Sequence, residues 1–456
     1  MNRTYKTTDM SVGHPIKIIL IFAIPLLIGA LFQQVYNVVD TMIAGHLIGD
    51  EAISAIGSTS ALYALIVNLA LGLNTGYSVL MSRAFGAKDI DLLKRKIAFS
   101  FVFNILLGII LTVISLILLK PLLRMINVPE NIFDDSYKYI VIIIAFMLST
   151  IIYNMFASIL RALGNSRVPL YFLIISCTIN LTSDIILVKV FGTGVEGLAY
   201  ATAIAQTISA ITVSIYFFIK YKEYIPTKNH YKFNKKLVYD MVTLGLSYMA
   251  LNCVVTLGSV FFQSAINSLG DKMITAWSSS RKAIGVLMQP LSCFAAALAT
   301  FTSQNYGAKR IDRIKYAFKW IIIIELVASV IFIGLGFLFG KNAIYLISGT
   351  KDEDIINNGY ISIICHFVMY PPLAILFCVR NGMQALGHKI IPVSSSIGEL
   401  IIKIIATYIV IPKVGFIGVC LTEPIIWLIF GVYILIALII EIKKEMILTL
   451  ESENNQ

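Results

Sequence analysis

The sequence predicts an all-α polytopic membrane protein, with twelve transmembrane helices in two pseudo-symmetric six-helix lobes around a central cleft. The composition, a series of long apolar runs and an internal duplication together predict this fold. The chain has 456 residues, of which 58% are hydrophobic and 13% are charged, whereas a soluble domain has about 25% charged residues. Since one helix needs about 20 apolar residues to cross a bilayer, this length accommodates about a dozen spans.

The apolar runs define the predicted helices in order, and the polar segment 220–236 separates six runs from six others. The first six are 18–39, 52–82, 97–119, 139–160, 168–190 and 197–219. The second six are 241–268, 274–306, 318–340, 355–379, 390–412 and 417–440. Backbone groups in lipid must be hydrogen-bonded within the chain, so these runs are expected to be helices, with kinks at Pro25 and Pro290. The predicted lobes are residues 1–225 and 226–456.

The two halves of the sequence resemble each other at offsets of 221 to 223 residues, and one ten-residue segment has six identities. The matching segments are Ser82–Asp91 with Ser303–Asp312, Gly49-Asp50 with Gly270-Asp271, and Ala162–Gly164 with Ala385–Gly387. A repeat with an even number of spans has the same orientation in the membrane in both copies. Such a duplication is typical of transporters that rock one lobe against the other.

The charge pattern predicts the orientation and excludes nucleic acid as a partner. The net charge is +11, but the basic residues are scattered in short clusters between apolar runs rather than gathered in one domain. With both termini in the cytoplasm, most Lys and Arg residues fall on the inner side, as the positive-inside rule requires. We therefore expect a multi-pass protein of the plasma (inner) membrane, whose first span is too long to be a cleaved signal.

Several classes of catalytic and metal-binding motif are absent from the sequence. There is no GxxxxGK[ST] loop, no HExxH motif and no nucleophile elbow. The six cysteines lie inside apolar runs without zinc-ligand spacing, which is typical of small buried hydrophobes. We therefore expect no enzyme and no cofactor, and a membrane-embedded enzyme would need a convergent catalytic set that the chain lacks. An ion gradient remains as the source of energy.

The order and spacing of short motifs along the whole chain resemble the multidrug and toxic compound extrusion (MATE) family. The matching residues are Ala23-Ile-Pro25, Val38-Val39-Asp40-Thr41, Gly45, Phe85-Gly86-Ala87-Lys88, Arg161-Ala-Leu-Gly164, Asn180, Asp184, Gly194-Val-Glu-Gly197 and Thr300–Gly307. The resemblance implies export of organic, often cationic, compounds, coupled to the inward flow of protons or sodium ions. It also implies a cation site on residues that match those described next.

Asp40 and Asp184 are the two acids inside spans of the first half, and each costs about 2.5–3.5 kcal/mol to insert without a partner. Helix geometry places Thr202 at a similar depth and Asn180 one turn before Asp184. These oxygen groups suit Na+ or, with one acid protonated, H+. The alternative is that both acids only bond to neighbouring helices. The positions equivalent to the four site residues in the second half are Phe261, Lys403, Thr407 and Glu423, so the acid pair is not repeated.

The second half has charges of both signs inside its spans. Glu399 and Lys403 are one turn apart, which predicts an internal ion pair, and Glu325 is expected to reach toward the cytoplasm. The alternative is that Glu399 or Glu423 is the counter-ion of a cationic drug. Residues that could line a substrate cleft are Gln33, Gln34, Tyr36, Asn37, Arg281, Met288, Glu399 and Glu423. For an aromatic residue or Met among them, packing between helices is the commoner role.

The sequence as a whole favours a secondary active antiporter that acts as a monomer in the lipid bilayer. It would export small amphipathic, often cationic, drugs or toxic compounds in exchange for inward H+ or Na+. The alternative is a flippase for lipid-linked precursors, from a related family of two-lobe exporters. Such flippases typically have extra spans and a strongly cationic cleft, whereas this chain predicts twelve spans and an acidic first lobe. The identity of the substrate and the choice of ion are not determined by the sequence.

Overall fold

The computed structural model describes residues 7–126 and 128–454, and every regular element in this part of the chain is helical. The ends of the chain, which are predicted to be cytoplasmic, include residues 1–6 and 455–456 outside the described part. The elements of the first half are α1 (Pro15–Leu47), α2 (Asp50–Gly86), α3 (Ile90–Met125), α4 (Glu130–Ala145), α5 (Met147–Ala162), α6 (Arg167–Ile185), η1 (Ile186–Val190) and α7 (Val195–Lys220). Two short 3-10 turns, η2 (Lys222–Tyr224) and η3 (Lys228–Tyr231), follow α7.

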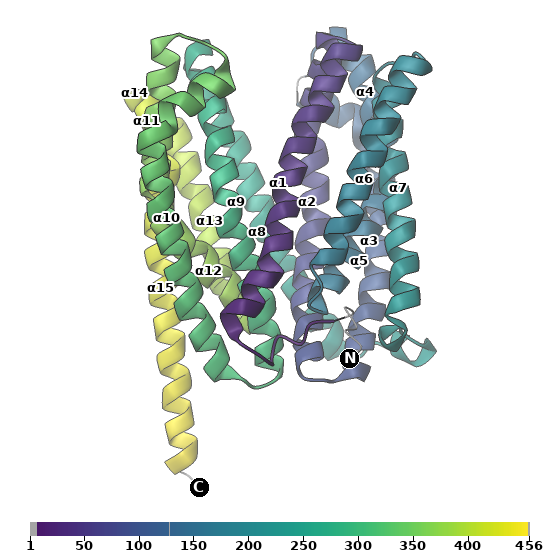
Figure 1. Cartoon of the computed structure of the whole chain (residues 1–456), viewed down its shortest axis with the longest axis vertical. Helices are drawn as coiled ribbons and strands as arrows, with labels where there is room; N and C mark the ends of the chain where they lie inside the picture. The colour runs from purple at the N-terminus through teal and green to yellow at the C-terminus, as the bar shows by residue number, and fades with distance from the viewer. Residues whose placement is uncertain (1–6, 127, 455–456) are drawn as a thin grey trace. The chain divides into compact units, whose positions relative to one another are not determined.

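The second half repeats this series of elements after the polar connection. Its elements are α8 (Lys235–Asn267), α9 (Asp271–Gly307), α10 (Ile311–Ser348), α11 (Glu353–Val368), α12 (Tyr370–Leu386), α13 (Ile390–Ile405), η4 (Ala406–Val410), α14 (Ile411–Val414) and α15 (Phe416–Asn454). Figure 1 shows these long helices in order along the colour bar. Each predicted apolar run lies within this series, so the all-helical prediction is confirmed.

The twelve predicted spans correspond to helices or to pairs of helices. Among the described residues, nine helices are long and apolar enough to cross a bilayer, and two bent pairs pass the same test together. The pairs are α4 with α5, bent by 46°, and α11 with α12, bent by 50°. The remaining span is the unbroken helical stretch 390–414, made of α13, η4 and α14. The fold is therefore the predicted twelve-span membrane architecture.

The sharp bends do not fall at the two prolines that the sequence singled out. Pro25 and Pro290 each lie inside one continuous helix, α1 and α9. The break between α11 and α12 has a clear cause, because Pro371 and Pro372 occupy the first turn of α12, where proline cannot continue a preceding helix. The break between α4 and α5 lies at Phe146, and nothing in the structure explains it.

The backbone conformation, like the sequence, repeats between the two halves of the chain. Lys88 and Lys309, which are equivalent at an offset of 221, are the two non-glycine residues of the described chain with positive φ, at 57° and 58°. Positive-φ glycines form further equivalent pairs: Gly49 with Gly270, Gly164 with Gly387, and Gly192 with Gly415. Since only a few residue types adopt this left-handed conformation readily, the matching positions confirm that both halves are copies of one six-span unit.

The described chain groups into two compact units, and helices α1 and α8 contribute residues to both. One unit contains residues 24–249, and the other contains residues 250–306 and 310–456, with a few flanking residues assigned to each. The predicted lobes, 1–225 and 226–456, divide the chain between its sixth and seventh spans, and this boundary stays a prediction. In the first unit, Leu237, Met241, Leu244 and Tyr248 of α8 join the core that α2, α3, α5 and α7 form. The beginning of α8 is thus packed into the first unit.

Two glycines of α2 permit its close approach to α8 within the first unit. A Cβ atom added at Gly76 would lie 2.7 Å from the Cα of Gly245, and one added at Gly72 would lie 2.5 Å from the Cα of Met249. Backbones that approach this closely are typical of small residues at interfaces between membrane helices. A side chain at either position would have to separate the two helices.

We expect Gly76→Ala to destabilise the protein by about 1–3 kcal/mol, because the added methyl group overpacks this interface. The measurement is the thermal unfolding midpoint of the purified protein in detergent. Gly57→Ala on the same helix is the matched control, because a Cβ there meets no atom within 4 Å. The midpoint should fall for Gly76→Ala and stay constant or rise slightly for Gly57→Ala. Equal midpoints for both variants would contradict the packing described.

Candidate functional site

The structure brings Asp40 and Asp184 together within the first unit. Asp40 comes from α1 and Asp184 from α6, and their carboxyl groups lie close enough together to interact electrostatically. Asp184 is fully buried, and its Oδ1 atom has no hydrogen-bond partner. Two unprotonated carboxylates at this separation would repel each other. Such a pair is suited to a proton or a cation bound between its oxygen atoms.

Asn180 connects the carboxyl pair to α1 and α7. Its amide group contacts Tyr36 Oη of α1 and Thr202 of α7. In the orientation that satisfies both amide atoms, the Asn180 nitrogen donates to Asp184 Oδ2 at 3.1 Å, and its oxygen accepts from Thr202 Oγ1 at 3.2 Å. The four residues of the predicted cation site are thus adjacent in space, with oxygen atoms from three helices.

Two phenol groups lie beside the carboxyl pair, and the sequence did not assign either of them to it. Tyr36, which was predicted for the substrate cleft, contacts Asn180 and is close enough to Asp40 for electrostatic interaction. Tyr139 of α4 is also close enough to Asp40 to interact with it. No sequence pattern predicts that Tyr139 lies near Asp40, because the two residues are on different helices and approach each other only in the folded protein. The spacing of Tyr36 to Asp40, one helical turn, was the available signal for Tyr36.

The other predicted cleft residues are distributed over both units. Gln33, Gln34 and Asn37 of α1 are exposed. Met288 of α9 is half-buried and packs against the apolar core of the second unit. Arg281 belongs to the ion network described next. Whether any of these residues contacts substrate stays a prediction.

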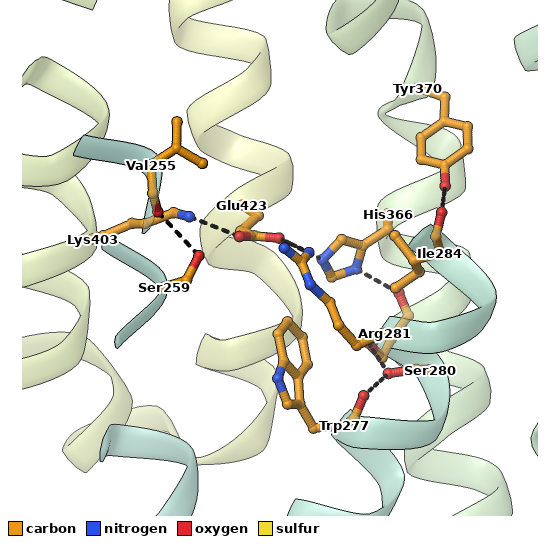
Figure 2. A network of polar contacts seen from close by, with 11 residues as sticks. Val255, Ser259, Trp277, Ser280, Arg281, Ile284, His366, Tyr370, Lys403 and Glu423 are labelled. Atoms are coloured by element: carbon orange, nitrogen blue, oxygen red, sulfur yellow. Dashed lines mark hydrogen bonds and ion pairs between the residues drawn. The ribbon is translucent and has the colours of Figure 1, made fainter. Parts of the chain in front are cut away.

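Glu423 of α15 is the centre of a buried ion network in the second unit (Figure 2). It pairs with Arg281 of α9, and its Oε1 atom accepts from Lys403 Nζ of α13 at 2.8 Å. His366 Nε2 of α11 lies 3.6 Å from Glu423 Oε2. Two cationic side chains thus already pair with the Glu423 carboxylate, so it is not free, and its role as the counter-ion of a drug stays a prediction.

The predicted ion pair between Glu399 and Lys403 is also wrong. Glu399 pairs with Arg380 of α12, whereas Lys403 pairs with Glu423 of α15. Both residues lie on the buried face of α13, but each finds its partner on a neighbouring helix. Sequence spacing shows which charges are one turn apart on a helix, and it does not show which helices pack against each side. Each buried charge is thus compensated across an interface.

Glu325 does not reach toward the cytoplasm as expected. Helix α10 begins seven residues before the predicted span, at Ile311 rather than at residue 318. Glu325 therefore lies roughly 21 Å along the helix from its first residue, and it is fully buried. Neither oxygen of its carboxyl group has a hydrogen-bond partner, and no cationic side chain within 4.0 Å pairs with it, among the residues that the structure describes.

Equivalent positions of the two units hold contrasting chemistry. Lys403 and Glu423 are the counterparts of Asn180 and Thr202, and each pair is in contact, at 2.8 Å and 3.2 Å. Thr407, the counterpart of Asp184, is buried with its hydroxyl unpartnered. The duplicated backbone therefore brings equivalent side chains together in both units. The first unit has an acidic oxygen cluster there, and the second has a fixed ion pair.

A duplicated set of twelve membrane helices with buried ionisable clusters defines a membrane transporter. The MatE family profile matches residues 25–186 and 248–409, and these two segments begin 223 residues apart (248 minus 25). The match covers more than half of the chain and has the same offset as the internal repeat. The chain belongs to the MatE family, and it is accordingly a transporter and not an enzyme.

Relatives and solved structures agree with this assignment. The chain is 28% identical over 334 residues to the probable multidrug resistance protein YoeA of Bacillus subtilis (strain 168), covering 72% of each chain. It is 25% identical over 385 residues to the probable multidrug resistance protein YpnP of the same organism, covering 84% of this chain and 85% of YpnP. A crystal structure of MATE in the bent conformation has a TM-score of 0.89 at 21% identity, covering 97% and 99% of the two chains. This last likeness shows the fold.

The corrected pairing in the second unit predicts which substitutions compensate each other. The Arg380 and Glu399 side chains are 5% and 11% exposed, so Arg380→Met should strand a buried charge and cost about 3–5 kcal/mol. Adding Glu399→Gln removes that charge and should restore part of the loss. The measurement is a double-mutant cycle of thermal stability in detergent.

The matched control is Lys403→Met, whose loss of stability should not be restored by Glu399→Gln, because Lys403 pairs with Glu423. If Glu399→Gln instead rescued Lys403→Met and left Arg380→Met unchanged, the pairing along α13 would be correct and the interhelical pairing would be wrong.

Proposed function

We propose that the chain is an antiporter that exports small amphipathic organic compounds in exchange for an inward coupling ion, H+ or Na+. The observation that carries the proposal is the proximity of the Asp40 and Asp184 carboxyl groups, with Asn180 and Thr202 beside Asp184. An acid pair buried at bilayer depth is costly and marks an ion pathway by default. In this site the cost is offset whenever a cation or a proton is bound.

We take H+ as the first candidate for the coupling ion. Two neighbouring carboxyl groups can share one proton, so Asp40 and Asp184 together can carry a single H+. Asn180 and Thr202 can hold this arrangement, because their amide and hydroxyl groups both donate and accept hydrogen bonds. Na+ remains the alternative, since the same four residues offer only oxygen ligands once both acids are deprotonated.

Antiport follows if the ion and the substrate stabilise different conformations of the transporter. Binding of H+ removes the net charge of the acid pair, and release of H+ restores a charge that needs a partner. A ligand can shift a conformational equilibrium only by its differential affinity for the two states, and the coupling is reciprocal. Loading of Asp40 and Asp184 should therefore weaken substrate binding, and substrate should in turn promote release of the ion.

The proposed substrates are drugs and toxic compounds rather than lipid-linked precursors. The relatives YoeA and YpnP are both named as probable multidrug resistance proteins, and the export protein MepA of Staphylococcus aureus, 22% identical over 341 residues, is named for multidrug export. The plasma membrane, cytoplasmic termini and a monomeric state belong to the same proposal. The positive-inside pattern supports the orientation.

The acid pair can be tested by transport into proteoliposomes with H+ and Na+ gradients imposed separately. We expect the H+ gradient to drive accumulation of a fluorescent dye such as rhodamine 123, and Asp40→Asn and Asp184→Asn to abolish it without loss of folded protein. Each substitution keeps the shape of the side chain and removes the acid that binds the proton.

Thr182→Val is the control for these variants. Thr182 is exposed on α6, two residues from Asp184, and its hydroxyl bonds to Thr178 of its own helix. Transport by this variant should match the wild type. Wild-type transport rates in Asp184→Asn would show that the acid pair is not the coupling site, and dye accumulation driven by Na+ alone would assign the site to sodium.

A further inference from the structure

The ion network of the second unit contains more positive than negative charge. It consists of Arg281, His366, Lys403 and Glu423, which we call the Arg281 cluster. Lys403 donates to Glu423 at 2.8 Å, and this contact alone balances the carboxylate. Arg281 pairs with the same carboxylate and therefore adds one positive charge that no second acid compensates among the described residues. The other buried pair of this unit described above, Arg380 with Glu399, is neutral in itself.

The surplus charge lies on the accessible member of the cluster. The Arg281 side chain is 36% exposed, whereas those of Lys403 and Glu423 are 9% and 4% exposed. A guanidinium group has five N–H donors in a fixed fork, and Arg281 uses NH1 for Glu423. The remaining donors are free to meet a ligand from the exposed side.

The surroundings hold Arg281 in place for such a contact. Its Cζ lies 5.7 Å from the centroid of the Trp277 ring, a distance typical of a cation–π interaction. Trp277 is itself buried, against Phe262 and His366. Figure 2 shows Arg281 extending from α9 toward Glu423, with Trp277 beside it and His366 facing it. The guanidinium is thus oriented before any ligand arrives, which lowers the entropic cost of binding.

A second polar group of the cluster, His366 Nε2, has Glu423 Oε2 at 3.6 Å but makes no hydrogen bond to any described residue. His366 is fully buried, and its Nδ1 atom contacts Ser362 O at 2.7 Å. Its Nε2 atom makes no hydrogen bond and faces Glu423 and Arg281. A buried polar atom without a hydrogen bond is costly in a protein interior. A bound group that reached the cluster could supply one.

We infer that the Arg281 cluster binds an anionic oxygen group of the transported compound, a carboxylate in the first instance. Arg is the residue best suited to such groups, because its fork matches a carboxylate with two parallel hydrogen bonds. The inference rests on the proposed function and deepens it, since it adds zwitterionic and anionic amphipathic compounds to the substrate class. It also reverses the expectation from the sequence, in which Glu399 or Glu423 would attract a cationic drug.

A matched pair of dyes tests the inference by equilibrium binding. Rhodamine 110 has a free carboxylate, and rhodamine 123 is its methyl ester, so the two differ only at the group in question. Fluorescence anisotropy with the purified full-length protein in detergent gives a dissociation constant for each dye. We expect rhodamine 110 to bind the wild type more tightly. Arg281→Gln should weaken rhodamine 110 binding by about tenfold or more, as for loss of a charged hydrogen bond, with little effect on rhodamine 123.

Two further variants separate recognition from general charge and from misfolding. Lys282→Gln removes an exposed positive charge from the next position on α9 and should leave both dissociation constants unchanged. Arg281→Lys keeps the charge and should retain part of the preference for rhodamine 110. Thermal unfolding of each variant checks that it is folded, and the comparison of the two dyes on the wild type needs no variant at all.

Each outcome bears on the inference separately from the proposed function. If rhodamine 123 binds and rhodamine 110 does not bind more tightly, the Arg281 cluster does not recognise a carboxylate, while export of organic compounds stands. The same conclusion follows if Lys282→Gln changes the preference as much as Arg281→Gln does. If neither dye binds the wild type and neither is transported, the proposed function fails and the inference fails with it.

Discussion

A polar or charged group at bilayer depth has to be compensated within the protein, and this constraint determines most of what the structure contains. The backbone meets it with helices throughout the described spans. The ionisable side chains meet it in two ways. Asp40 and Asp184 lie close together, and we propose that a mobile ion or proton compensates them, whereas Glu423 and Glu399 are each neutralised by fixed cations of the chain. Only the first arrangement changes its energy when an ion arrives or leaves, and it is therefore the one suited to coupling.

Duplication followed by divergence explains how one chain contains both arrangements. The two units keep the same backbone features, as expected for copies of a common ancestor. These features include the left-handed residues Lys88 and Lys309 and the break in the fourth span of each repeat. They keep the contact between equivalent positions of the fifth and sixth spans as well, while the side chains differ. Lys403 places a tethered cation where the first unit has Asn180, so the second unit needs no external ion at that position. Its accessible Arg281 is then available for another ligand.

The sequence was sufficient for the fold and for the residues of the acid pair, and insufficient for the second ion network. Long apolar runs predict membrane helices because the bilayer sets their length and composition, and the repeat offset predicts the duplication. Asp40 and Asp184 were identifiable because so few acids occur in these spans. The partners of Lys403 and Glu399 were not, because spacing along α13 reports neighbours on one helix only, and the choice between α12 and α15 depends on packing. Tyr139 was missed for the same reason.

Exchange of a proton on the Asp40–Asp184 pair against substrate is tested most directly by measuring proton release when substrate binds. Purified protein in weakly buffered detergent solution, with a pH-sensitive dye as reporter, would be mixed with saturating rhodamine 123. Because coupling is reciprocal, the wild type should release protons on binding, and the Asp40→Asn/Asp184→Asn double variant should bind the rhodamine and release none. Equal release from both proteins, or none from a wild type that binds the rhodamine, would contradict the claim.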